Sequence, residues 1–338
     1  MKKIYFFPLL LLLGACNLSG PVVPDTDPTP TLVAQDIDLP TASQQVVPQE
    51  ARWGIYRLEL ETQAVVLIYD SPISIPTLDL NRAGDRLVFS QKTGGESDSS
   101  EEIFTIRTDG SNLRRITNND FRDLYPVWSP DGSQIAFLSM RTTSLGIYVM
   151  NNDGSENKSL YDSSAHEADI DWRGDQIAFT KDSRIWIMQS DGTNARPITN
   201  PPMAGEWGRA NLPFGDYDPR ISPDGTKVIF ERLVDDQSSH GNYDLFMIDA
   251  ESFTENQLTH SGYSQGLASW SNSGDWIVYI VAAVGDDGQY DLYLMKVDGS
   301  ENRNITPAYF PPQFLCRWAV FSHDDSAIYF SGEWWPLD

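Results

Sequence analysis

The sequence predicts an all-β fold: a six-bladed β-propeller of four-stranded antiparallel blades. A strand–turn–strand segment, seen most clearly at residues 125–137 (YPVWSPDGSQIAF), recurs in six copies. Half a blade remains at each end, with two strands at 54–68 and two at 316–331. Because pairing the first strands with the last closes a ring, we expect residues 54–68 to complete the last blade.

The chemistry of each copy is that of a β-hairpin. Pro130 presets φ for a turn, Asp131 bonds local backbone, and Gly132 tolerates a positive φ. Asp-Gly between two alternating apolar runs is a strong hairpin signal. Full copies lie at 169–179, 218–230 and 267–279, and weaker ones at 77–89 and 318–330.

A second hairpin follows the first in each repeat. Residues 147–154 (IYVMNNDG) are typical of this segment, and a short outer strand comes after it. Gly84 and Gly132 are 48 residues apart, and Gly225 and Gly274 are 49 apart. A four-stranded propeller blade takes about 40–50 residues. The period therefore fits one blade per repeat.

These motifs resemble the WD-like propeller repeat of the TolB family. The resemblance rests on Trp128-Ser-Pro-Asp-Gly132 with its variants and on segments such as 148–154, and it covers residues 53–335. The resemblance implies a role in the bacterial cell envelope. The TolB family carries an α/β domain ahead of the propeller, and residues 17–50 are too few for one.

The first fifty residues have the pattern of an export signal and a tether. Residues 1–15 read as a signal peptide, and residues 13–16 (LGAC) resemble a lipobox that implies lipidation of Cys16. An ordinary signal with a chance cysteine is the alternative. The stretch 16–50 has the composition of a disordered tether, and 51–338 form one domain. We expect a lipid-anchored extracytoplasmic protein, on the outer membrane if the cell is Gram-negative.

The charge balance is strongly acidic. The 338 residues hold 24 Lys and Arg against 48 Asp and Glu, a net charge of −24. Such a surface argues against nucleic acid and anionic lipid as partners and favours solubility or basic partners. With Cys16 lipidated, Cys316 has no intramolecular disulfide partner and is expected to be a buried apolar residue.

Acidic residues are predicted to gather at one mouth of the channel. When the inner strands are aligned on their turns, a column of residues falls at the strand entrances: Ile75, Asp123, Glu167, Asp216, Gln265 and Cys316. Asp169 and Asp218 lie two positions further on. Three interpretations stay open: backbone bonding at a strand entrance, a basic side chain from a partner, or Ca²⁺ held by Asp123, Glu167 and Asp216.

The long connections are predicted to lie on one face of the ring, opposite the tight turns, and binding residues concentrate on such loops. The longest connection between blades, 200–216, carries Trp207, Arg209 and Phe214. Aromatic residues with arginine are typical of interface hot spots. The alternative is that the two aromatic side chains fold back against the ring.

The catalytic patterns lack the context that they need. Ser264 sits in a G-x-S-x-G sequence, but a nucleophile elbow requires a strand before it and a helix after it. The histidines are separate loop residues: His166, His240, His260 and His323. We expect a monomeric, non-enzymatic scaffold for a protein or peptide with no required cofactor. The alternative is a hydrolase or lyase acting on sugar, lactone or peptide at the axial mouth.

Overall fold

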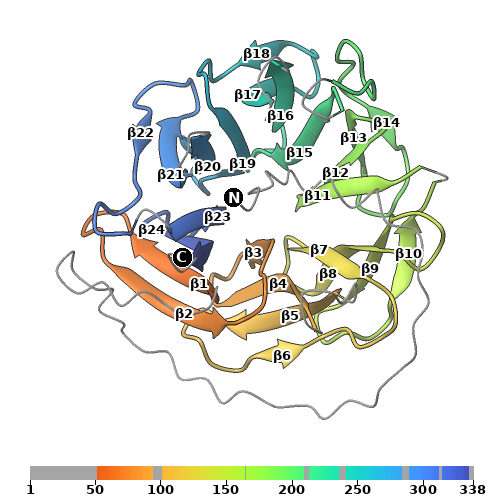
Figure 1. Cartoon of the computed structure of the whole chain (residues 1–338). Coiled ribbons are helices and arrows are strands. Elements are labelled where there is room, and N and C mark those ends of the chain that lie inside the picture. The colour runs from red at the N-terminus through yellow and green to blue at the C-terminus, as the bar shows by residue number, and fades with distance from the viewer. Residues whose placement is uncertain are drawn as a thin grey trace.

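The protein is a ring of six four-stranded antiparallel sheets around a central axis (Figure 1). The computed structural model describes residues 52–93, 101–163, 165–208, 213–235, 241–283, 289–311 and 314–334. Within these ranges every regular element is a strand. The prediction of a six-bladed propeller is confirmed.

Each of the first five blades takes four consecutive strands, ordered from the axis outward. Blades 1 and 2 are β3 (Leu78–Leu80), β4 (Arg86–Lys92), β5 (Glu101–Arg107), β6 (Arg114–Arg115), then β7 (Asp123–Trp128), β8 (Gln134–Ser139), β9 (Gly146–Asn151), β10 (Lys158–Tyr161). Blades 3 and 4 are β11 (Glu167–Arg173), β12 (Gln176–Lys181), β13 (Arg184–Gln189), β14 (Arg196–Pro197), then β15 (Asp216–Ile221), β16 (Lys227–Asp235), β17 (Asn242–Asp249), β18 (Glu255–Gln257). Blade 5 is β19 (Ser264–Trp270), β20 (Trp276–Ala283), β21 (Gln289–Lys296), β22 (Arg303–Asn304).

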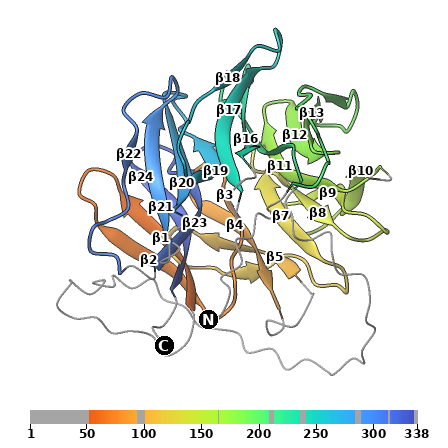
Figure 2. The same ribbon diagram turned by 45° about the horizontal axis from the view of Figure 1, so that its top comes forward.

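Blade 6 joins the two ends of the described chain. Its inner strands are β23 (Phe314–Phe321) and β24 (Ala327–Trp334), and its outer strands are β1 (Arg52–Glu59) and β2 (Val65–Ser71). β1 pairs with β24 without interruption along its whole length. The expected closure by the strands at 54–68 is therefore confirmed, and Figure 2 shows β1 and β24 side by side in one sheet.

An aromatic pair on the second and third strands recurs in every blade. The pairs face each other across the strands with ring centroids 5.4–6.3 Å apart: Phe89–Phe104, Phe137–Tyr148, Phe179–Trp186, Phe230–Phe246, Tyr279–Tyr293 and Phe330–Tyr56. Such pairs contribute about 0.5–1.5 kcal/mol beyond the area they bury. In blade 6 the third-strand partner is Tyr56 of β1, so β1 fills the place of a third strand in packing as well as in pairing.

The tight turns follow the hairpin chemistry of the sequence. Gly132 has φ 71° and Gly225 has φ 76°, both in the left-handed region that glycine adopts without a Cβ clash. In the last copy Asp325 takes this conformation, with φ 58°. Asp131 accepts hydrogen bonds from the hydroxyls of Ser129 and Ser133, which lower the pKa of its carboxyl.

Five inner strands, β7, β11, β15, β19 and β23, carry a bulge near the middle, and in the first four a residue of the bulge has a positive φ. Tyr125, Asp169, Asp218 and Leu267 have φ between 49° and 56°, and the strand register shifts at each of them. A bulge locally re-aims side chains. The four equivalent positions therefore present their side chains differently from a regular strand, and three of them form the centre of the ring, as described below.

The two faces of the ring differ in their connections. The tight turns, from first to second strand and from third to fourth, lie on one face, which we call the tight-turn face. The connections from second to third strand and between blades lie on the other, the long-loop face, as the strand directions require.

Candidate functional site

The carboxylates predicted to line the long-loop mouth are enclosed within the blades. Asp123, Glu167 and Asp216 are all 0 % exposed, and Gln265 and Cys316 are buried as well. Each acidic residue begins an inner strand and lies across from a position on the second strand of the same blade: Ser139, Lys181 and Arg232. Their side chains therefore do not form an open wall of the channel.

Two of these carboxylates, Asp216 and Asp123, each form an ion pair with an arginine of the same blade. Asp216 forms an ion pair with Arg232, whose Nη2 lies 2.8 Å from Oδ2. Asp123 accepts a hydrogen bond from Ser139 and pairs with Arg141 at 3.1 Å. The negative charge of each buried carboxylate is therefore neutralised by an arginine of its own blade.

Glu167 is compensated less completely. It accepts a hydrogen bond from the Ser163 hydroxyl and lies across from Lys181. Burial raises its pKa to about 7, and the hydroxyl and the lysine offset only part of that effect. The neutral form of this carboxyl is therefore favoured to a higher pH than in an exposed glutamate.

Arg141, Lys181 and Arg232 also lie over aromatic rings, including members of the aromatic pairs. Arg232 lies 5.2 Å from the Phe230 ring and 4.7 Å from the Phe246 ring. Arg141 covers Phe137 and Tyr148 in the same way, and Lys181 covers Tyr161 and Trp186. The signal in the sequence is a basic residue soon after the second-strand aromatic, which sequence reasoning overlooked.

The three carboxylates do not meet at a metal site. Among the described residues, no group of three or more His, Cys, Asp or Glu side chains is arranged to hold a metal ion. The geometry thus gives no support to a calcium site at Asp123, Glu167 and Asp216, because each side chain is already engaged with its own blade.

Asp169 and Asp218, by contrast, come together at the axis. Asp169 Oδ2 accepts a hydrogen bond from the backbone N of Asp218, and Asp218 accepts one from the hydroxyl of Tyr125. Arg220 pairs with Asp218 at 2.9 Å and lies 4.6 Å from the Trp318 ring. Blades 2, 3, 4 and 6 are joined in this axial network.

The axial network holds more acid than base. Burial, and next the charge of Asp218, raise the pKa of Asp169 to about 7. Glu231, which accepts a hydrogen bond from Leu267 N, also has its pKa raised well above normal by burial and by Asp218 and Asp169. Arg220 is the cation of the network and is itself buried. The network therefore retains protons that exposed carboxyls would lose.

The loop at 200–216 divides into an exposed and a packed part. Trp207 is 65 % exposed, whereas Phe214 packs against Tyr217, Leu233 and Tyr243. Arg209 lies outside the described residues. One aromatic side chain thus folds back against the ring and the other projects into solvent.

Exposed apolar side chains concentrate on the long-loop face. Four of them lie on blade 4 or on the connections that flank it, and we call them the apolar arc: Met203, Trp207, Val234 and Tyr263, which are 49, 65, 40 and 51 % exposed. Phe121 lies on the same face, and Phe253, in the β17–β18 turn, lies on the other. Large apolar side chains gathered on one face are typical of an interaction surface.

The structure shows the surroundings of Ser264 and of three of the four histidines considered for a catalytic role. Ser264 begins β19 and its hydroxyl accepts a hydrogen bond from Tyr243 N, so it lies on no nucleophile elbow. His166 accepts a hydrogen bond from Leu145 N, and His260 and His323 are exposed. His240 lies outside the described residues.

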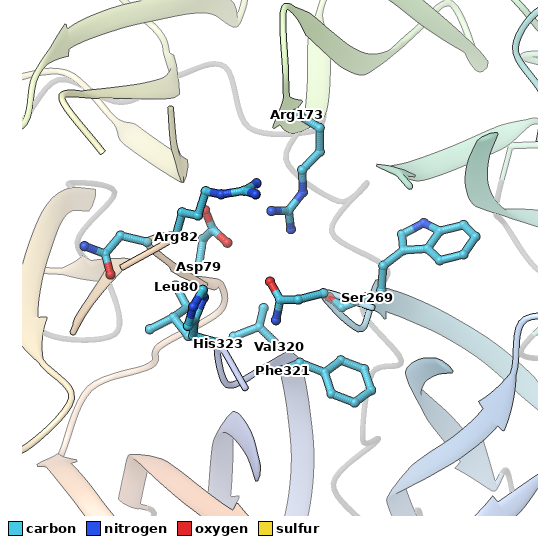
Figure 3. A pocket seen from close by; sticks show the side chains of 11 residues that line it. Asp79, Leu80, Arg82, Arg173, Ser269, Val320, Phe321 and His323 are labelled. Carbon is cyan, nitrogen blue, oxygen red and sulfur yellow. The ribbon is translucent and has the colours of Figure 1, made fainter. Parts of the chain in front are cut away.

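A small pocket opens at the opposite mouth of the channel, on the tight-turn face. Its polar lining includes Asp79, Arg82, Arg173, Asn272 and His323. Figure 3 shows Arg82 and Arg173 reaching into it from different sides, beside Asp79. Sequence reasoning placed binding on the long-loop face and missed this pocket.

The predicted leader, tether and lipid anchor fall on residues 1–50. Residues 1–51, with Cys16, lie outside the described residues. In the part of the chain that the structure describes, no helix has the length and apolar character to cross a membrane.

Comparison with known proteins agrees with the architecture. Residues 50–206 match the family model of the TolB beta propeller domain. A protein TolB homolog of Chlorobium luteolum is 28 % identical over 171 residues, which make up 49 % of this chain and 34 % of that one. This chain thus matches about a third of that relative's length.

Solved structures share the ring. A TolB candidate from Agrobacterium tumefaciens superposes with a TM-score of 0.63 at 16 % identity, over 85 % of this chain and all of that one. An oligogalacturonate lyase from Vibrio parahaemolyticus superposes with a TM-score of 0.50 at 11 % identity, over 82 % of each chain. Likeness at such identities shows the fold alone. The repeat, the family model matched over residues 50–206 and the TolB relatives together make this ring similar to TolB-type β-propellers.

Proposed function

We propose that this chain is a non-enzymatic, protein-binding scaffold of the bacterial cell envelope. The observation that carries the proposal is the apolar arc on the long-loop face, where Trp207 and Tyr263 are each more than half exposed. The relatives named TolB support an envelope role. No arrangement of the described residues favours the hydrolase or lyase alternative.

The partner is expected to combine an apolar patch with positive charge. Aromatic anchors contribute most of the binding energy at protein interfaces. A net charge of −24 attracts a basic partner and speeds its approach. Arg209, next to the arc in sequence, would then contribute hydrogen bonds at the edge of the contact, and a basic side chain of the partner could approach Asp169 and Asp218 through the axial mouth.

The proposed location is extracytoplasmic, with lipid on Cys16 and residues 16–50 as a tether. The lipobox-like sequence before Cys16 motivates this proposal. Replacing Cys16 with Ser should move the protein from the membrane fraction to the soluble fraction. An unmodified Cys16 in the mature protein, seen by mass spectrometry, would contradict it.

The direct test is photocrosslinking in cells that make the protein. A photoreactive residue at Trp207 or Tyr263 should trap the same partner in a defined adduct. The matched control position is Phe253, which is 49 % exposed but lies on the tight-turn face. Equal adducts from all three positions, or none from the arc, would refute the proposed surface.

A further inference from the structure

The pocket on the tight-turn face lies on the axis of the ring. Its lining comes from the ends of four inner strands, β3, β11, β19 and β23, which belong to blades 1, 3, 5 and 6. Blades on both sides of the ring can share one pocket only where their inner strands converge. Figure 3 shows this convergence, with Arg173 on one side and His323 with Arg82 on the other.

Three lining residues replace the proline of the tight turn. Pro130 and Pro223 hold this position in the regular copies, and Arg82, Asn272 and His323 hold it in blades 1, 5 and 6. Arg173 likewise stands where Ser129 stands in the regular copy. The degenerate copies thus place polar side chains at the axis, where the regular copies have turn residues.

The two arginines of the pocket carry unused hydrogen-bonding capacity. In the described ranges, no carboxylate oxygen is within 4 Å of either guanidinium, whereas Arg141, Arg220 and Arg232 are all ion-paired. The Nε of Arg173 is buried and has no hydrogen-bond partner among the described residues. A guanidinium presents five N–H donors in a planar fork that matches a carboxylate.

Asp79 lies in the same pocket but is directed to the backbone. Its Oδ2 accepts a hydrogen bond from Trp128 N of the next blade at 2.8 Å. Burial raises its pKa to about 6, and Arg173 is the charge that lowers it most. With Asp79 ionised and His323 neutral, the charged lining residues still sum to one positive charge, and the carboxylates of Asp171 and Asp325 lie behind the lining, near Asp79 and Asn272.

The surroundings of the pocket limit the kind of anion that fits. The tight turns carry aspartates whose pKa values are lowered by hydroxyl and backbone hydrogen bonds, among them Asp131, Asp224 and Asp324. These ionised groups repel an extended polyanion. The pocket is also small, with a space of about 370 Å³ that includes open solvent. A ligand with one anionic group and an otherwise neutral or basic structure would avoid this repulsion and would need to place only that group in the pocket.

We propose that the tight-turn mouth of the channel is a carboxylate-binding site, with Arg82 and Arg173 as the arms that hold the ligand. The shared chemistry is one carboxylate, from either a free small acid or the C-terminus of a peptide. The site goes beyond the proposed function, which uses the opposite face.

The test compares carboxylate ligands with a matched neutral one. The full chain is titrated with acetate, with a short peptide that ends in a free carboxylate, and with the same peptide ending in an amide. Binding is followed by ligand-observed NMR. The free acid should bind and the amide should bind at least about tenfold more weakly, because it loses charge-assisted hydrogen bonds. Equal binding of acid and amide would overturn the proposal.

A charge-matched pair of variants locates the site. Arg82 is exposed, so Arg82→Met should fold normally and weaken binding of the acid about tenfold. Arg114→Met removes the same charge from an exposed position on β6 and should leave binding unchanged. Equal weakening in both variants would show a general charge effect and overturn the site.

Two further measurements distinguish a free small acid from a peptide C-terminus as the ligand, and the tight-turn face from the long-loop face as its site. If acetate competes with the peptide at similar concentration, the site takes free small acids. If the peptide binds far more tightly, the site takes a chain terminus. Trp207→Ala should leave carboxylate binding intact, so that failure of the proposed function does not mask this result. Loss of binding in Trp207→Ala would contradict a separate site.

Discussion

Buried carboxylates in this ring are neutralised by their own blades. Asp216 is fully buried against Arg232, and Asp123 against Arg141. Like charges placed on successive blades need compensation, and the structure supplies it across two neighbouring strands rather than from a bound ion. The same cations cover the aromatic pairs, so charge and packing depend on the same side chains.

Asp216→Ala should lower the free energy of unfolding by about 3 kcal/mol, because it leaves Arg232 partly buried without its main partner. Glu255 pairs with the same arginine from a more exposed position, at 2.9 Å. Glu255→Ala should therefore cost less than about 1 kcal/mol. Denaturant unfolding of both variants checks this, and a more stable Asp216→Ala would mean that the carboxylate lacks a cation.

Asp169→Asn should stabilise the protein in mildly alkaline solution. The folded pKa of Asp169, about 7, exceeds its ordinary value of 3.8, so its stabilising contribution is complete below about pH 4 and is lost as pH rises toward 7. Asparagine stays neutral and also tolerates the φ of 49° at this position.

The variant and the parent should therefore be equally stable near pH 4, and the variant should be more stable at pH 8 by at most about 4 kcal/mol, the limit set by a rise in pKa from 3.8 to about 7. Denaturant unfolding across this range measures the difference. A variant that is less stable at pH 8 would show that the network requires an ionised Asp169.

Strand β1 is the element on which the ring depends. It pairs with β24 along its length, and its Tyr56 stacks 5.4 Å from Phe330 as the third-strand aromatic of blade 6. The six equivalent second-strand aromatics are all at most 1 % exposed. Closure therefore rests on the packing that holds each blade together, as well as on backbone hydrogen bonds.

Tyr56→Ala should cost about 3–5 kcal/mol, the usual cost of deleting a buried aromatic side chain. Tyr148→Ala removes the equivalent tyrosine, which is 8 % exposed like Tyr56, from blade 2, which is formed by consecutive strands. We expect similar losses by chemical denaturation. A loss below about 1 kcal/mol in Tyr56→Ala alone would show that β1 is only loosely attached.

At the scale of the whole molecule, the architecture follows from local signals and the site does not. The turns at Gly132 and Gly225 can be predicted from the four residues of the Ser-Pro-Asp-Gly sequence. The two strands at 54–68 have no partners near them in the sequence, so pairing with the last strands is the expected way to close the ring. The cation partners of Asp123 and Asp216 come from the adjacent strand or from the residues just after it, which an alignment of inner strands alone does not include.

The axial pocket was missed for a related reason. Arg82, Asn272 and His323 stand where the regular turn motif has proline, so in the sequence they are simply departures from the motif. Only the ring brings these departures together with Arg173, from the far side of the axis. Asp169 and Asp218 lie on inner strands, as the alignment of the repeats indicates, whereas the hydrogen bond of Asp218 with Tyr125 depends on strand bulges that have no clear signal in the sequence.

The measurement that most directly tests binding by the long-loop face is the affinity of the trapped partner for three alanine variants of the full chain. Trp207→Ala and Tyr263→Ala should each weaken binding roughly 30-fold, since exposed aromatic anchors commonly carry 2 kcal/mol or more. Phe253→Ala, on the tight-turn face, should bind as the parent does. Unchanged affinity in both arc variants, or an equal loss in Phe253→Ala, would contradict the assignment of the long-loop face as the binding surface.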